Sequence, residues 1–430
     1  MKKKTNPRSG IRLFKISDDR SVFADNTFAL GVMQVVKYVF PLITLPYLAR
    51  VLGSDGYALR AYVVAYMVFM QTILDYGFSQ YGTKAVALRA DNRKAISEIS
   101  GNAYVAKAVM ALVAGCITIV ATVSIPIMRS NPLFVAASFV SVVLKALLPD
   151  FVLQGLQDMR AMAVRYAGTQ TLALALIFIL IRSSDQILLV PVIEGAASLI
   201  AVIWSEAYLR RRYEIKPRCV SLRDVLQTIE KSTPLFLAVA ASSFMANTIT
   251  VLMGVFSIDA LTLSCWSIAS TILAGIQAMW QPISRSLFPH MVKKTDYGLV
   301  RKLLLIGTPI IGVLAVAIGA MSDSVMMVMG GSEYVEGSYV LRGVLPTLIF
   351  SYPISILGYP VIGALGKPSW LSVCVVATGL SQFLVLMVAG LSGHFTIEII
   401  IAARVGSEAL LCLLEAFMAM RVLRSKRAIP

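Results

Sequence analysis

The sequence predicts an all-α membrane protein that crosses the bilayer many times. Of its 430 residues, 57% are hydrophobic and only 14% are charged, and the mean hydropathy is +0.77. A soluble domain of this composition would expose a large apolar surface to water. The apolar residues also form runs of about 20, the length a helix needs to cross the ~30 Å hydrocarbon core. These runs are continuous rather than alternating, which excludes a β-barrel.

Twelve such runs can be placed along the chain. The run at 166–182 is the shortest and ends at Arg182. We expect about twelve transmembrane helices, at residues 26–50, 58–80, 103–127, 132–156, 166–182, 186–209, 234–256, 260–284, 301–322, 340–364, 368–391 and 395–420.

The basic residues predict the orientation of these spans. Most of the 39 lysines and arginines fall in the two ends of the chain and in the loops after even-numbered spans. Short loops rich in lysine and arginine stay in the cytoplasm, so both termini are expected there. The net charge of +16 is thereby explained by topology, and no nucleic-acid partner is expected.

A basic segment midway along the chain divides the spans into two sets of six. It begins with Arg210, Arg211 and Arg212, and we expect it to be a cytoplasmic linker. Parallel repeats of this kind place a binding site between the halves. Val51–Gly56 and Val255–Ala260 align weakly as equivalent hairpins, although chance matching of apolar residues is an alternative. The expected parts are a tail at 1–25, an N-lobe at 26–209, the linker at 210–233, a C-lobe at 234–420 and a tail at 421–430.

The first two spans contain the most unusual residues. Lys37 lies near the middle of the first span together with Pro41 and Pro46, and Asp75 lies near the end of the second. A tight turn at 53–56 is expected between them. A charge at the centre of a spanning helix costs about 2.5–3.5 kcal/mol, so Lys37 should face protein or water rather than lipid. This hairpin therefore predicts a polar path through the membrane.

No catalytic motif is present. The sequence has no phosphate-binding loop, no nucleophile elbow and no HExxH motif. Its five cysteines and two histidines are scattered, so no metal site or cofactor is expected. The loops on the side opposite the termini are short, which leaves no room for an extramembrane catalytic domain.

Ionisable residues within the spans are the candidate functional residues. We expect Lys37, Lys145 and Arg404 to line a cavity, since lysine and arginine bind phosphate groups. Gln34 and Gln281 would add hydrogen bonds to sugar hydroxyls. Buried carboxylates can titrate or bind a coupling cation, and the candidates for this role are Asp75, Asp150 and Glu408.

Structural roles are the alternatives for several of these residues. Arg404 and Glu408 are four residues apart and could pair on one helix, and Asp150 could be hydrated without a role. Lys145 is expected near the centre of its span. The arginines at span ends are expected to reach toward the membrane interface; these are Arg50, Arg60, Arg182 and Arg285.

Several short motifs follow one another along the chain. They are Leu45–Gly53 with Gly56-Tyr57, Asp75–Phe78, Pro149–Met159, Leu287–Pro289, Glu333-Tyr334 and Gly363–Lys367. Together these motifs resemble bacterial polysaccharide flippases of the O-antigen type, in the MOP exporter superfamily. The resemblance covers about residues 26–420, and departs from the family pattern at Ala58 and at Val152-Leu153.

This resemblance implies two six-helix lobes in a V around a central cavity, which opens alternately to the two sides of the bacterial inner membrane. The implied cargo is an undecaprenyl-pyrophosphate-linked oligosaccharide, moved from the cytoplasmic to the periplasmic leaflet. A proton or sodium gradient would drive it. The other implied partners are membrane lipids, a polysaccharide polymerase and a chain-length regulator.

Two other functions are alternatives. A multidrug or cation antiporter of the same superfamily would favour an acidic cavity, and the central lysines argue against it. A polymerase or glycosyltransferase acting on lipid-linked sugars would need a sizeable extramembrane loop, and every loop here is short.

Overall fold

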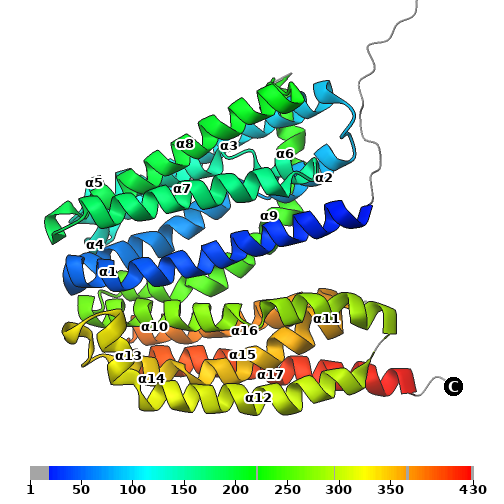
Figure 1. The fold of residues 1–430 in the computed structure, drawn as a ribbon. Helices are drawn as coiled ribbons and strands as arrows, with labels where there is room; N and C mark the ends of the chain where they lie inside the picture. Colours follow the sequence, from blue (N-terminus) through cyan, green and yellow to red (C-terminus); the bar gives the residue numbers. More distant parts are fainter. Residues whose placement is uncertain (1–18, 219–220, 295, 365–367, 428–430) are drawn as a thin grey trace, which may run out of the picture.

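A computed structural model describes residues 19–218, 221–294, 296–364 and 368–427. These residues fold into helices joined by short connections, and no strand occurs among them (Figure 1). The first helices are α1 (Asp19–Asp75), α2 (Phe78–Ala87), α3 (Arg93–Ser124), α4 (Pro126–Arg129), α5 (Pro132–Ala146), α6 (Asp150–Gly155), α7 (Met159–Leu180), η1 (Ser184–Gln186) and α8 (Leu189–Tyr213).

The remaining helices continue from the linker to the end of the described chain. One of them, η3, is a π-helix. They are α9 (Leu222–Val255), α10 (Ala260–Ala278), α11 (Gln281–Lys294), α12 (Tyr297–Ala320), α13 (Ser322–Met329), η2 (Ser332–Tyr334), α14 (Ser338–Val344), α15 (Pro346–Ile356), η3 (Leu357–Gly363), α16 (Pro368–Leu391) and α17 (Ile397–Arg427).

The predicted fold class is confirmed. Within the described ranges, nine helical segments are long and apolar enough to cross a membrane, the first at 28–87 and the last at 370–391. The protein is therefore an all-α, multi-pass membrane protein. The finer expectations, twelve spans and a division at 210–233, remain predictions.

The helices lie roughly along one direction. In Figure 1, α3, α5, α7 and α8 lie on one side of α1, whereas α10, α12, α15 and α17 lie on the other. Helix α9 packs against α1, α2 and α3 and also against α10 and α16. We refer to α1–α8 as the N-terminal helices and to α10–α17 as the C-terminal helices. The described start of α1 and the end of α17 lie at the same end of the bundle (Figure 1).

The first hairpin is tighter than predicted. Helix α1 keeps helical geometry on both sides of Gly53, which alone departs from it, with φ 67° and ψ −179°. Other residues rarely adopt a positive φ, and glycine does so without steric cost. The break between the two helices therefore lies at Gly53, the first residue of the turn predicted at 53–56.

Four other predicted spans are interrupted. The span predicted at 58–80 breaks after Asp75, where Tyr76 and Gly77 have positive φ. The span at 132–156 breaks between α5 and α6, and Pro149 caps the second piece. The spans at 260–284 and 340–364 divide into α10 and α11, and into α14, α15 and η3. These breaks divide the helices and not the spans, since 132–155, 260–292 and 338–363 are each a single helical segment long and apolar enough to cross a membrane.

Tyr62 on α1 packs against Gly254 on α9. A Cβ atom built on Gly254 would lie 2.0 Å from the Tyr62 ring, and Tyr62 is itself fully buried. The two helices can approach this closely only because residue 254 lacks a side chain.

We predict that Gly254→Ala lowers stability by about 1–3 kcal/mol, the usual cost of overpacking a core. Gly312→Ala is the matched control, since a Cβ there has nothing within 4 Å and gains only helix propensity. Thermal unfolding of both purified variants would test this. An unchanged melting temperature for Gly254→Ala would contradict the packing described.

Candidate functional site

A cavity of about 360 Å³ lies among the N-terminal helices α1, α5, α7 and α8. Its wall contains both polar and apolar residues. The charged and polar members are Lys37, Thr44, Arg60, Ser141, Lys145, Arg165, Tyr166, Thr169, Gln170, Glu194 and Ser198.

The cavity has an excess of positive charge. Arg60 pairs with Glu194 at 3.7 Å, and Arg165 pairs with Asp150 at 2.5 Å. Lys37 and Lys145 are exposed into the cavity, and no salt bridge to either is found in the part of the chain that the structure describes. Two cations are thus balanced locally, and the two lysines are not.

A fifth cation approaches from the C-terminal helices. Arg285 on α11 lies close enough to Lys37 to act on its charge, as does Lys145. Its guanidinium contacts Gln281, whose side-chain oxygen accepts a hydrogen bond at 3.4 Å. Like charges that lie close together repel one another, and an anion bound between them offsets that repulsion. That Arg285 reaches toward the interface remains a prediction.

The end of α5 places Lys145. The helix stops at Ala146, one residue later, so Lys145 lies in the last turn of α5, although it stays near the middle of the apolar span 132–155. A cation is favoured there by the carbonyl groups that a helix end leaves unpaired. Lys107 also lies at this end of α5 but does not line the cavity. It is buried, donates to the Ala146 carbonyl and lies 5.5 Å from the centre of the Phe151 ring.

Two of the cavity arginines were not predicted as site residues. Arg60 was expected to reach the interface, but it lines the cavity instead. Arg165 was placed before the fifth span, whereas α7 already begins at Met159. The signal that could have found Arg165 is Asp158, which caps α7 by accepting a hydrogen bond from the Ala161 amide.

The acidic candidates of the N-terminal helices lie near one another. Asp75 accepts a hydrogen bond from Gln71 at 3.1 Å, and Asp150 pairs with Arg165. Both carboxylates act on the charge of the buried Lys107. The structure therefore brings Asp75 and Asp150 around one lysine, and the coupling role predicted for them remains a prediction.

The other candidates lie outside this cavity. Arg404 and Glu408 form an ion pair of 2.9 Å on α17, as their spacing predicted. Gln34 is half-buried on α1, one turn before Lys37. Gln281 is exposed at the start of α11 beside Arg285. The binding and coupling roles of these residues remain predictions.

Hydrogen bonds join the N- and C-terminal helices at the end of the bundle remote from the termini, which we call the distal end. Arg50 donates to the Val328 carbonyl at 2.6 Å, and Tyr334 donates to the Ala49 carbonyl at 3.2 Å. The Ser54 amide donates to Glu333 at 3.3 Å. Arg50, which was expected to reach toward the membrane interface, therefore connects the N-terminal helices to the C-terminal helices.

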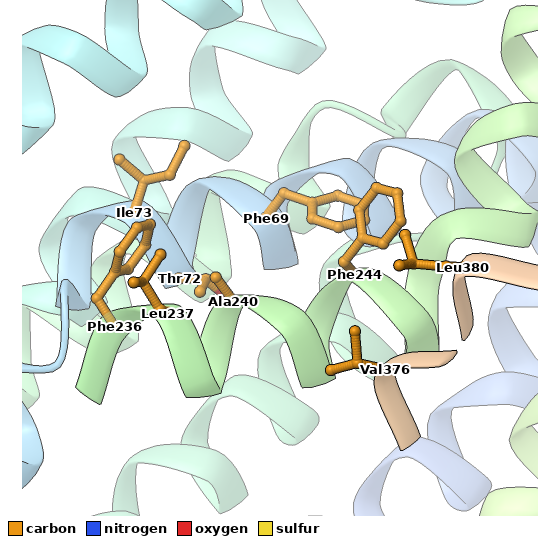
Figure 2. Close-up of a pocket in the computed structure, with 9 residues that line it drawn as sticks. All are labelled: Phe69, Thr72, Ile73, Phe236, Leu237, Ala240, Phe244, Val376 and Leu380. Carbon is orange, nitrogen blue, oxygen red and sulfur yellow. The ribbon is translucent and has the colours of Figure 1, made fainter. Parts of the chain in front are cut away.

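A second cavity, of about 420 Å³, lies between α1, α9 and α16 (Figure 2). Thr72 is its single polar residue, and the hydroxyl already donates to the Val68 carbonyl and to Ser243. This cavity offers no free charge or polar group to a ligand, unlike the cationic one. Its lining is Phe69, Thr72, Ile73, Phe236, Leu237, Ala240, Phe244, Val376 and Leu380.

Residues 23–295 match the family described as "Polysaccharide biosynthesis protein". The chain belongs to this family. The family and the relatives below indicate a transporter rather than an enzyme, as the absence of catalytic motifs predicted.

Curated relatives of this family member share its sequence at low identity. It is 23% identical over 281 residues to a protein of Escherichia coli strain K12 named "Putative O-antigen transporter", covering 65% of this chain and 68% of the relative. It is 24% identical to a protein of the same name from Shigella dysenteriae, with 65% and 69% covered.

Solved structures share the fold of this family member. A multidrug resistance MATE transporter of the MOP superfamily, in an inward-facing conformation, matches with a TM-score of 0.66 and 14% identity over 94% of this chain and 100% of that one. The lipid II flippase MurJ, in an inward closed conformation, matches with a TM-score of 0.67 and 10% identity over 92% and 87%. At these identities the likeness concerns the fold alone.

We predict that Asp150→Asn destabilises the protein by about 3–5 kcal/mol, because it leaves the buried Arg165 guanidinium without its counter-ion. Exchanging both partners, as Asp150→Leu with Arg165→Met, should cost less than the single change, since no unpaired charge remains. Thermal unfolding of the purified variants measures both. A double variant less stable than Asp150→Asn would show that the pair itself contributes stability.

Proposed function

We propose that this protein flips an undecaprenyl-pyrophosphate-linked oligosaccharide from the cytoplasmic to the periplasmic leaflet of the bacterial inner membrane, with both termini in the cytoplasm. The observation that carries the proposal is the cavity with two unpaired lysines, Lys37 and Lys145, among membrane-length helices. The names of the curated relatives support an O-antigen type of cargo.

A cationic cavity suits the head group of such a lipid. A pyrophosphate carries several negative charges that lose hydration inside a membrane protein, and lysine and arginine replace that hydration with charged hydrogen bonds. Lys37, Lys145 and Arg285 are positioned to supply them. The hydroxyl and amide groups of Ser141, Thr169 and Gln170 on the same wall suit the sugar hydroxyls. A cationic drug would be repelled, which disfavours an antiporter of cations.

The bonds at the distal end support a cycle of alternating access. They hold the N- and C-terminal helices together at the end remote from the termini, so passage to that side requires them to break. With the termini in the cytoplasm, this end faces the periplasm. A proton or sodium gradient would drive the cycle, with Asp75, Asp150 and Glu408 as the coupling candidates. A polysaccharide polymerase and a chain-length regulator would act on the product.

We predict that Lys37→Ala and Lys145→Ala each reduce transport about tenfold to a hundredfold, since a hydrogen bond to a charged group contributes about 1.5–3 kcal/mol. The measurement is surface polysaccharide in a null strain that carries each gene, together with the side of the membrane on which lipid-linked units accumulate. Arg129→Ala is the charge-matched control, because Arg129 is exposed on α4 outside the cavity. Normal polysaccharide in well-expressed lysine variants would contradict the cavity assignment.

We predict that Arg50→Ala opens the distal end. Losing its bonds to the carbonyls of Met327 and Val328 removes roughly 1–3 kcal/mol from the closed state and raises the open population about fivefold or more. The readout is the rate at which a membrane-impermeant maleimide, added from the periplasmic side, labels Thr44→Cys in a background without other cysteines.

The control for this experiment is Arg182→Ala. Arg182 is exposed and contacts the carbonyl of Ile179 within its own helix end, so its loss removes a charge without releasing a contact between the two sets of helices. Equal labelling rates in the Arg50 and Arg182 variants would argue against a distal closure.

A further inference from the structure

Glu415 is the most deeply buried carboxylate of α17. Its residue is 1% exposed, and its Oε2 atom is buried without a hydrogen-bond partner. The three acids predicted to couple an ion all have a partner: Gln71 for Asp75, Arg165 for Asp150 and Arg404 for Glu408. An ionisable group inside a membrane protein is costly unless it is paired or neutral, so Glu415 requires a different explanation.

The carboxyl group lies against the bent backbone of η3. Gly358 departs from helical geometry with ψ −105°, and a Cβ atom there would lie 3.1 Å from Oε1 and 3.2 Å from Oε2 of Glu415. The absence of a side chain at Gly358 lets the carboxyl approach this closely. Pro360 in the same segment has no amide proton to donate. A π-helical segment of this kind often marks a functional site.

The titratable neighbours of Glu415 do not offset a negative charge. On its own helix, Glu408 acts on it as a like charge, and Cys412 lies within electrostatic range. Cys374 faces it from α16. On the side of α15 and η3, Tyr352 donates to the Leu303 carbonyl and Tyr359 is stacked on Phe288. Among the charges that act on Glu415 in the described chain, none is positive.

A metal ion does not fit this place. The described residues contain no group of three or more His, Cys, Asp or Glu side chains that could hold one. The nearby Thr378 hydroxyl donates to the carbonyls of Cys374 and Val375 on its own helix. A single carboxyl group without further ligands suits a proton, which neutralises the acid with one bond.

We propose that Glu415 is a proton-binding site of the C-terminal helices and holds its proton while its carboxyl lies against η3. Releasing the proton requires water or a cation to reach the carboxyl, and that requires η3 and α17 to separate. The proton site stands independently of what is transported. That its proton is coupled to transport rests on the proposed function.

Infrared spectroscopy of the full chain in lipid nanodiscs tests proton binding. We expect a carbonyl stretching band of a protonated carboxylic acid at neutral pH, lost in Glu415→Gln and kept in Glu408→Gln, whose acid is ion-paired. Gly358→Ala gives a second test that keeps the acid, because its methyl group would meet the carboxyl and should shift the frequency of the same band. A neutral-pH spectrum without this band, or a band unaffected in both Glu415→Gln and Gly358→Ala, would overturn the proposal.

Transport by the Glu415→Gln variant tests whether the proton bound by Glu415 is coupled to transport. If the proton is coupled, the gene for this permanently neutral variant should restore at least tenfold less surface polysaccharide than the wild-type gene, while the variant keeps the wild-type melting temperature. If the variant gene restores surface polysaccharide fully and the infrared band is still assigned to Glu415, the proton is not coupled to transport, although Glu415 does bind a proton. Failure of the Lys37 and Lys145 variants to affect polysaccharide would instead count against the proposed cargo.

Discussion

The cost of holding a charge inside a membrane protein constrains the whole of this structure. Apart from Glu415, the deeply placed cations and acids described above either have a partner or line a cavity. Arg165 has Asp150, Lys107 has the carbonyl end of α5, and Arg404 has Glu408. Lys37 and Lys145 have neither a salt bridge among the described residues nor lipid around them, because they face a cavity. Function is therefore most readily sought at the charges that the fold leaves unbalanced.

The fold class followed from the sequence because hydrophobic length is a strong signal. Runs of about 20 apolar residues admit few structures other than spanning helices. The interruptions inside those runs were harder to foresee. At Gly53 a single residue separates two helices, and at Pro149 the helix of one span divides in two. Both breaks depend on backbone geometry that neighbouring helices stabilise.

The site could be predicted only in part. Lys37 stood out because it interrupts an apolar run, and the structure places it on the cavity wall. Arg60 and Arg165 did not stand out, since arginines near span ends are common and usually reach the interface. Their position on the wall depends on where α7 begins and on Glu194 from α8, which are facts of packing. Glu415 is not among the residues predicted from the sequence, and its isolation depends on the bend at Gly358.

The contact between Tyr62 and Gly254 bears on how the molecule can move. The Tyr62 ring lies directly against the bare backbone at Gly254 and fixes the distance between the two helices, so a rotation of one helix relative to the other would turn about this point. It would then act as a fulcrum. Tyr62 lies only nine residues beyond the Gly53 junction, which puts this fulcrum near the distal end. For a given rotation about this point, displacement increases with distance along each helix, so the end of the bundle that carries both termini would move farthest.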